Sequence, residues 1–211
     1  MIQAVIFDLD GVIVLTDECH YNAWKRIADE EGIYFDRRIN NRLRGVSRME
    51  SLEIILELAE KKYTQAEKET MAEKKNGYYR EYIDKLTPDA ILPGVMENLK
   101  ELKADNIKIA IGSSSKNTSL ILKRIGLDGY FDAVSDGNNI LKSKPDPEVF
   151  LKAAEMLGIS SENCMVVEDA DAGIIAGKRA GMKTLAVGAA EGGDFKAESL
   201  SSVRLSELLK L

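Results

Sequence analysis

Cysteine is scarce in this sequence of 211 residues, which contains only Cys19 and Cys164. Two cysteines in unrelated contexts provide neither a disulfide framework nor the ligand spacing of a metal-binding motif. We therefore predict two buried free thiols in a protein of a reducing compartment.

Basic residues are outnumbered. The chain has 29 Lys and Arg against 35 Asp and Glu, and its net charge is −6. Because the two signs are mixed along the chain, no clustered basic face is predicted, and a nucleic-acid partner is not expected. A small anionic substrate is compatible with this charge, since a few lysines in one cleft can outweigh the global sign.

Long apolar runs are also missing. None approaches the roughly 20 residues that span a bilayer. The opening segment MIQAVIFDLDG lacks the basic region and the long apolar stretch of a signal peptide. We therefore expect a cytoplasmic protein without a membrane partner.

An alternation of strands and helices occupies most of the chain. Short apolar segments are typical of strands buried on both faces, and three of the helical patterns between them end at a glycine followed by an apolar residue. The strands are expected at residues 3–7, 108–112, 133–134, 165–167 and 184–187, and the helices near residues 94–105, 116–126, 146–157 and 171–181. This order predicts an α/β fold, a doubly wound parallel sheet with a Rossmann-like core, whose ligands bind outside the carboxyl ends of the strands.

A helical segment interrupts this alternation after the first strand. It contains only helical periodicity, with a capping box at Ser47–Glu50 and a long helix near residues 65–85. We predict a small all-helical cap domain over residues 16–87, inserted into an α/β core that consists of residues 1–15 and 88–211.

Two aspartates follow the first strand directly, in the run Asp8-Leu9-Asp10-Gly11. In an extended chain Asp8 and Asp10 project to the same side, at the end of the strand where ligands bind. Two carboxylates this close repel each other unless a cation lies beside them or one keeps its proton. The pair suits a nucleophile that attacks phosphorus next to Mg²⁺ and a second carboxyl group that moves a proton. The alternative is a strand-ending turn in which both aspartates cap local amides.

Hydroxyl groups and a lysine follow other strands at the same edge. The run Ser113-Ser114-Ser115 comes after the second strand and is predicted to open a helix, where hydroxyls and free amides bind an anion or simply cap the helix. Lys144 lies in the run Lys144-Pro145-Asp146-Pro147, whose prolines stiffen the turn. A lysine held in this way suits a phosphoryl group as a point charge.

An acidic pair follows a fourth strand. Glu168 and Asp169 come directly after residues 165–167, with Asp171 two residues later. Such a pair is repulsive unless a hard cation lies among its oxygens, and Mg²⁺ accepts one or two carboxylates together with phosphate oxygens. The alternative is capping of the next helix. Together, four strands bring a carboxylate pair, hydroxyls, a lysine and an acidic pair to one end of the sheet, which predicts phosphoryl transfer.

In the order D-x-D-G, Ser, Lys-Pro, Glu-Asp, and over its whole length, the sequence resembles the haloacid dehalogenase superfamily. The resemblance implies that Asp8 is the nucleophile and Asp10 the general acid and base. It implies that Ser113 and Lys144 bind the transferring phosphoryl group. It also implies a Mg²⁺ site formed by Asp8, Asp10, Glu168 and Asp169.

Within that superfamily the helical insert resembles the β-phosphoglucomutase branch. The similarity is carried by Asp8-Leu9-Asp10-Gly11-Val12-Ile13, His20, Trp24, Arg44-Gly45-Val46-Ser47-Arg48, Ser51, Lys74-Lys75-Asn76 and Ser113-Ser114-Ser115-Lys116-Asn117. It implies that the guanidinium of Arg48 holds a non-transferring phosphate. A lone histidine is more often structural, but the resemblance implies that His20 pairs with Lys75 and links cap closure to the placement of Asp10.

The same resemblance implies roles for further residues. Catalytic roles are implied for Thr16, His20 and Lys75, and contacts to substrate or phosphate for Trp24, Arg44, Gly45, Ser47, Arg48, Ser113, Ser114, Ser115, Asn117 and Lys144. Two positions depart from the branch. The first linker reads Val14-Leu15-Thr16, without the acidic or hydroxyl residue common before the threonine, and Arg44 stands where a lysine is common. The first departure bears on cap closure and the second preserves the charge.

The implied activity is the interconversion of β-D-glucose 1-phosphate and β-D-glucose 6-phosphate through the 1,6-bisphosphate and a phosphorylated Asp8. Sugar phosphates are then the expected partners of a monomer, with an isologous dimer as the alternative. A sugar-phosphate phosphatase uses the same core residues with water as acceptor and is the first rival function. The second is a non-enzymatic phospho-acceptor module, a class that lacks both the long helical insert and the leading D-x-D.

Overall fold

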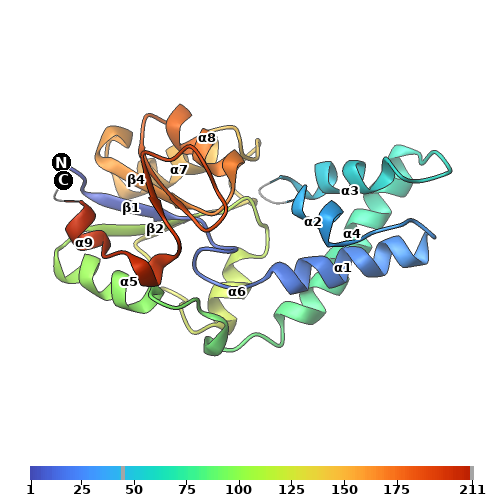
Figure 1. Cartoon of the computed structure of the whole chain (residues 1–211), viewed down its shortest axis with the longest axis horizontal. Coiled ribbons are helices and arrows are strands. Elements are labelled where there is room, and N and C mark those ends of the chain that lie inside the picture. The colour runs from blue at the N-terminus through green and yellow to red at the C-terminus, as the bar shows by residue number, and fades with distance from the viewer. Residues whose placement is uncertain (44–45, 210–211) are drawn as a thin grey trace.

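The computed structural model describes residues 1–43 and 46–209, in which an α/β core and a group of helices lie next to each other (Figure 1). Arg44 and Gly45, both predicted to contact the substrate, lie outside the described residues. Within the described ranges, no helix has the length and apolar character needed to cross a membrane.

A six-stranded parallel sheet forms the centre of the core, in the order β3-β2-β1-β4-β5-β6. The strands are β1 (Ala4–Phe7), β2 (Lys108–Gly112), β3 (Ala133–Ser135), β4 (Cys164–Glu168), β5 (Lys183–Val187) and β6 (Phe195–Ala197). The chain builds outward from β1 to β3 and then returns to the other side of β1 with β4. This confirms the predicted doubly wound sheet and places a topological switch point between β1 and β4, where ligands of such sheets bind.

Helices cover both faces of the sheet. They are α5 (Val95–Ala104), α6 (Thr118–Arg124), α7 (Glu148–Leu157), α8 (Asp171–Arg179) and α9 (Leu205–Leu208), with short 3₁₀ helices at Pro88–Ala90, Ser161–Asn163 and Leu200–Ser202. The side chains of β1 alternate between the two layers. Val5 and Phe7 pack in one apolar cluster with Leu99 of α5, and Ile6 packs in the other with Phe150 of α7. The central strand is therefore buried on both faces.

The inserted helices have an apolar cluster of their own. They are α1 (Asp17–Glu30), α2 (Arg37–Asn41), α3 (Arg48–Leu56) and α4 (Gln65–Ile83), and they form the right-hand part of Figure 1. Trp24 of α1, Leu52 and Ile55 of α3 and Ala72 of α4 are buried together. This cluster is distinct from those around the sheet, whereas Ala23 of α1 and Tyr79 and Ile83 of α4 belong to the cluster of the core.

The two segments that connect the insert to the core pair with each other. Val14 and Ile91 form an antiparallel bridge, and the Leu15 amide donates to the Ala90 carbonyl at 3.1 Å. Thr16 follows this short ribbon and precedes α1. The insert therefore joins the core through a narrow two-stranded connection.

Local sequence motifs correctly predicted the ends of several helices. The capping box at Ser47 is present, since the Glu50 amide donates to the Ser47 hydroxyl and the Ser47 amide to the Glu50 carboxylate. Gly158 ends α7 with a φ of 68°, a left-handed conformation that favours glycine, and the Ile159 amide donates back to the Ala154 carbonyl. The elements β6, α2 and α9 were not predicted because none has more than five residues, too few to show a periodic pattern.

Both cysteines are free. Cys164 is buried as predicted, whereas Cys19 on α1 is partly exposed, which corrects that part of the prediction. Burial raises the pKa of the Cys19 thiol and raises that of Cys164 to about 11. Neither thiol is therefore an activated thiolate.

Candidate active site

Asp8 lies where β1 ends, at the switch point of the sheet. Its amide donates to the Val167 carbonyl of β4 at 2.9 Å, which fixes the backbone between the two central strands. Gly11 in the following turn has a φ of 85°, and a Cβ atom there would come within 2.2 Å of Asp169 Oδ2. A glycine is thus required in this turn by both its backbone conformation and the close approach of the acidic side chain.

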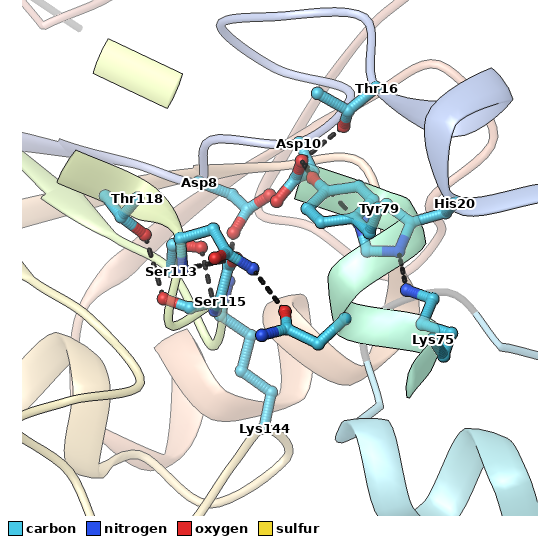
Figure 2. Close-up of polar contacts among 12 residues, drawn as sticks. Asp8, Asp10, Thr16, His20, Lys75, Tyr79, Ser113, Ser115, Thr118 and Lys144 are labelled. Atoms are coloured by element: carbon cyan, nitrogen blue, oxygen red, sulfur yellow. Dashed lines mark hydrogen bonds and ion pairs between the residues drawn. The ribbon is translucent and has the colours of Figure 1, made fainter. Parts of the chain in front are cut away.

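Lys144 joins Asp8 to Glu168. Its Nζ is 2.5 Å from Asp8 Oδ1 and 2.5 Å from Glu168 Oε1, and all three side chains are buried. Burial lowers the pKa of Lys144, but the charges of Asp8 and Glu168 outweigh it, so the pKa is raised and the ammonium group is retained. Burial, reinforced by the charge of Asp8, raises the pKa of Glu168 to about 7. In Figure 2, the Lys144 side chain extends from below toward Asp8.

Removing this lysine is expected to destabilise the fold. Lys144→Ala leaves two buried carboxyl groups without their shared cation, and breaking a buried ion pair from one side costs about 3 kcal/mol or more. We expect that loss in the free energy of unfolding, measured by urea titration in the presence of a chelator. Added Mg²⁺ should then stabilise Lys144→Ala more than the unmodified protein, because the cation replaces part of the missing charge.

The matched control for this experiment is Lys142→Ala. The Lys142 side chain is 74% exposed and lies 3.8 Å from Asp146. Surface pairs of this kind contribute at most about 1 kcal/mol. Equal stabilities of Lys144→Ala and Lys142→Ala would contradict a structural role for the buried ammonium.

Asp8, Glu168 and Asp169 form an acidic group whose ligand atoms all lie within 4.8 Å of one another. Oxygen ligands of this kind are those that a hard divalent cation prefers. Gly173 of α8 leaves the space, since a Cβ atom there would come within 1.9 Å of Glu168 Oε1. The donor set and the fitted space therefore suit a divalent metal ion.

Asp10 was predicted as a fourth ligand, but among the described residues its side chain is not part of this group. The later acidic residue Asp171 also lies elsewhere in the fold: it opens α8 and accepts from the Glu191 amide at 2.8 Å. The three carboxylates that lie together are supplied by the ends of β1 and β4, and a role for Asp10 as a further ligand stays a prediction.

Asp10 faces the inserted helices. Thr16 Oγ1 donates to Asp10 Oδ1, the Tyr79 hydroxyl donates to the same oxygen at 3.5 Å, and His20 Nε2 lies 4.0 Å from it. Burial, followed by the charge of Asp8, raises the pKa of Asp10 to about 6. The two aspartates of the D-x-D run therefore differ in surroundings: Asp8 contacts the Lys144 ammonium, whereas Asp10 faces Thr16, Tyr79 and His20 (Figure 2).

The buried Lys75 and the partly exposed His20 form a pair on the inserted helices, next to Asp10. Lys75 Nζ lies 3.0 Å from His20 Nδ1, and the Lys75 ammonium also lies over the rings of Trp24 and Tyr79. Burial, followed by the charge of Arg48, lowers the pKa of Lys75 to about 7, and burial followed by the charge of Lys75 lowers the pKa of His20. Because the lysine is a donor, the neutral imidazole accepts at Nδ1 and carries its proton on Nε2, which faces Asp10.

The serine run forms a loop rather than the first turn of a helix. Helix α6 begins at Thr118, two residues later than predicted. The Ser113 hydroxyl accepts from the Ser115 amide at 3.1 Å, and the Ser115 hydroxyl accepts from the Asn117 amide at 3.2 Å. Ser114 Oγ is buried and has no hydrogen-bond partner among the residues that the structure describes. The hydroxyls are thus held in a turn at the carboxyl end of β2.

Arg48 is the first residue of α3 and points away from its own helix. Its Nη2 donates to Asn76 Oδ1 at 2.8 Å, and its Nη1 lies 3.5 Å from the exposed Glu73 carboxylate. Ser47, predicted to contact the substrate, uses its hydroxyl to cap α3. Arg48 therefore provides a cation from the inserted helices to the cavity that Lys144 lines from the core.

These side chains surround one cavity of about 700 Å³. Its lining contains most of the predicted site residues, namely Asp8, Asp10, His20, Trp24, Ser47, Arg48, Lys75, Ser113, Ser114, Ser115, Asn117, Lys144, Glu168 and Asp169. Thr16 is not in the lining, but it contacts two lining residues: its hydroxyl donates to Asp10 and its carbonyl accepts from the His20 amide at 3.0 Å. Tyr79 and Asn76 are among the lining residues that were given no role from the sequence. Tyr79 follows Lys75 by four positions on α4, a spacing that puts both on one helix face.

The comparisons with known proteins agree with this geometry. Residues 2–181 match the family model of haloacid dehalogenase-like hydrolases. The beta-phosphoglucomutase of Bacillus subtilis is 49% identical over 212 residues, covering 98% of this chain and 93% of that protein. The crystal structure of beta-phosphoglucomutase from Clostridium difficile superposes with a TM-score of 0.92 at 41% identity, covering 100% of this chain and 96% of that one.

A phosphatase is also among the relatives. The phosphorylated carbohydrates phosphatase of Thermotoga maritima is 32% identical over 186 residues, which cover 87% of this chain and 83% of that protein. Both kinds of relative match the chain over most of its length, but the identity to the mutase is considerably higher. The chain belongs to the haloacid dehalogenase-like hydrolase family and, within it, to the β-phosphoglucomutase branch.

Proposed function

We propose that this protein is a phosphomutase that interconverts β-D-glucose 1-phosphate and β-D-glucose 6-phosphate through β-glucose 1,6-bisphosphate and an aspartyl phosphate on Asp8. The observation that carries the proposal is the presence of cations on two sides of one cavity. Lys144 lies beside Asp8, and Arg48 approaches from α3 on the inserted helices. A substrate with a phosphate at each end needs two such positions at once.

The proposed cycle uses Asp8 and Asp10 in turn. In the first half, phospho-Asp8 transfers its phosphoryl group to the 6-hydroxyl of β-glucose 1-phosphate, while Asp10 accepts the hydroxyl proton. The bisphosphate then turns round in the cavity. In the second half, an Asp8 oxygen attacks the phosphorus of the phosphate group on the C1 oxygen. The bond between that phosphorus and the C1 oxygen breaks, and Asp10 returns the proton to the C1 oxygen. Glucose 6-phosphate leaves and phospho-Asp8 is restored.

The neighbours of each aspartate support these roles. Lys144, with the hydroxyl of Ser113, is placed to bind the phosphoryl group that moves. Asp8, Glu168 and Asp169 are the proposed ligands of Mg²⁺, which when bound reduces the charge repulsion between the phosphoryl oxygens and the attacking carboxylate. Thr16 and the His20–Lys75 pair orient Asp10 from the insert.

The inserted helices have a further proposed part. We assign residues 16–87 to a cap and residues 1–15 and 88–211 to the core, joined by the ribbon at Val14 and Ile91. A cap closed over the cavity excludes water, which would otherwise hydrolyse the aspartyl phosphate. Sugar phosphates are the proposed partners, and the proposed state is a monomer.

The rival function is a sugar-phosphate phosphatase, in which water replaces the sugar hydroxyl. The core residues Asp8, Asp10 and Lys144 would serve it equally well, and a phosphatase is among the relatives. Arg48 and the His20–Lys75 pair favour the mutase, because a phosphatase has no need to hold a second phosphate. The test is to supply β-glucose 1-phosphate, Mg²⁺ and a trace of the 1,6-bisphosphate and to follow two products together. Glucose 6-phosphate formed in dependence on the bisphosphate supports the mutase, whereas free phosphate alone supports the phosphatase.

Arg48→Ala is expected to separate the two activities. Loss of a charge-assisted contact to the distal phosphate weakens mutase turnover about 10- to 100-fold. Hydrolysis of p-nitrophenyl phosphate should stay within about threefold, because that substrate carries no second phosphate. Both rates are measured at saturating Mg²⁺. Arg48→Lys keeps the charge but loses the planar fork and is expected to recover only part of the mutase rate. A parallel loss of both rates would contradict the assignment of Arg48 to the distal phosphate.

A further inference from the structure

Asn76 of α4 connects the inserted helices to the core through a single oxygen atom. Arg48 Nη2 donates to Asn76 Oδ1 at 2.8 Å, and Asn117 Nδ2 donates to the same oxygen at 3.0 Å. Arg48 belongs to the insert, whereas Asn117 belongs to the serine loop after β2. All three residues line the cavity. One carbonyl oxygen thus collects donors from both sides of the cavity.

Donors that converge on one oxygen are arranged as they would be around an oxygen of a phosphate group. The guanidinium fork and a side-chain amide both suit phosphate. Asn76 is uncharged, so its carbonyl oxygen is a weaker acceptor than a phosphate oxygen, and an entering phosphate can replace it. Among the residues that the structure describes, the other hydrogen-bond acceptor of the Arg48 guanidinium is Glu73, whose side chain is 77% exposed and which lies 3.5 Å from Nη1. Without Asn76, that contact would draw the guanidinium toward the surface.

Building on the proposed function, we propose that Asn76 is a positioning residue for the distal phosphate of the substrate. Its Oδ1 holds Arg48 and Asn117 in place until a phosphate oxygen takes over the same two donors. The contact also joins cap to core beside the cavity, so the phosphate takes over a bridge that already exists. Asn76 then lowers the cost of ordering the long Arg48 side chain when the substrate binds.

The test compares Asp8 phosphorylation by two donors in single-turnover experiments. Glucose 1,6-bisphosphate carries a distal phosphate and p-nitrophenyl phosphate does not. In Asn76→Ala, the bisphosphate concentration for half-maximal rate is expected to rise about 10-fold, the range for a hydrogen bond to a charged group. The reaction with p-nitrophenyl phosphate should change less than about twofold. Alanine is a better helix former than asparagine, so α4 is retained, and thermal unfolding verifies this.

A second arm asks whether Asn76 acts through Arg48. In an Arg48→Ala background, adding Asn76→Ala should raise the half-saturating bisphosphate concentration by less than about threefold, because the charged group that it positions is gone and only the neutral amide of Asn117 remains. The matched control is Arg80→Ala, four residues further along α4, where an exposed side chain lies outside the cavity. This control should behave as the unmodified protein with both donors.

Three results would overturn the proposal. These are an unchanged half-saturation in Asn76→Ala, an equal loss with both phosphoryl donors, and an equal effect of Asn76→Ala with and without Arg48. The proposed function is judged separately, by conversion of β-glucose 1-phosphate. If the bisphosphate phosphorylates Asp8 but glucose 6-phosphate is not formed from glucose 1-phosphate, the mutase proposal fails. The comparison of the two donors in Asn76→Ala then still tests whether Asn76 positions the groups that bind the distal phosphate. A protein that the bisphosphate does not phosphorylate would overturn both.

Discussion

Replacing Asp8 with asparagine is expected to abolish phosphoryl transfer, with turnover of β-glucose 1-phosphate falling by at least about 10⁴-fold. Removal of the nucleophile from a covalent mechanism costs on the order of 10⁶-fold in a well-studied hydrolase, and asparagine has no carboxylate with which to attack phosphorus. The shape of the side chain is preserved, so the contact from Lys144 can still be made to the amide oxygen. The loss should therefore appear in chemistry and not in folding.

Two measurements check this prediction. Steady-state formation of glucose 6-phosphate gives the fold-change, and mass spectrometry after borohydride reduction of the phosphorylated protein identifies the modified residue. Asp136→Asn is the matched control, because Asp136 is also a buried aspartate that follows a strand, β3, but it lies outside the cavity. That variant should retain activity. A phosphoryl group found on Asp10, or activity of Asp8→Asn above one-hundredth of the unmodified rate, would contradict the assigned nucleophile.

The position of this nucleophile was accessible from sequence for a simple reason. In a parallel sheet, the residues at the carboxyl ends of the strands lie along one edge. An apolar segment that ends at a polar residue therefore predicts a strand and also predicts that the polar residue lies at this edge. Asp8 and the serine loop follow β1 and β2 in this way, and Glu168 is the last residue of β4. Once the strands were recognised, the convergence of these groups required no knowledge of side-chain contacts. Lys144 belongs to the same edge through its stiffened turn.

The contacts of the inserted helices were less accessible. Helical spacing shows which side chains share a face, but the angle at which two helices cross is set by packing that no local pattern records. The Asn76 bridge joins α4 to α3 and to the loop after β2, segments far apart along the chain. The pairing of His20 with Lys75 was expected from the family resemblance, not from spacing, and the structure places the two atoms 3.0 Å apart.

The position of the Asp10 side chain was also not accessible from the local pattern. Period-two alternation put Asp8 and Asp10 on one side of an extended chain, and the family resemblance implied that both are metal ligands. The backbone leaves the extended conformation at the turn around Gly11, and Asp10 instead accepts from Thr16. The strand ends at Phe7 and the chain bends at Leu9, so the alternation of the strand does not continue to Asp10.

Because Asp10 lies apart from Asp8, we expect Asp10→Asn to affect two phosphoryl donors differently. Transfer from glucose 1,6-bisphosphate to Asp8 should slow by about 10²- to 10⁴-fold, the usual contribution of a positioned acid or base. Transfer from p-nitrophenyl phosphate should slow less than about tenfold, because nitrophenolate leaves without a proton whereas a sugar alkoxide does not. Single-turnover labelling of Asp8 with each donor measures both rates.

The two aspartate variants are expected to differ in how the two donors label residue 8, and this difference tests the role of Asp10. Asp8→Asn should lose labelling with both donors, because the acceptor itself is removed. Asp10→Asn should lose labelling only with the donor that needs a proton, because its nucleophile is intact and the Lys144 contact to Asp8 is untouched. Equal slowing of both donors by Asp10→Asn would mean that Asp10 acts on Asp8 or on the metal site instead of on the leaving oxygen. Selective slowing assigns the proton to the carboxyl group that faces the inserted helices, and so makes closure of those helices a condition for the chemistry.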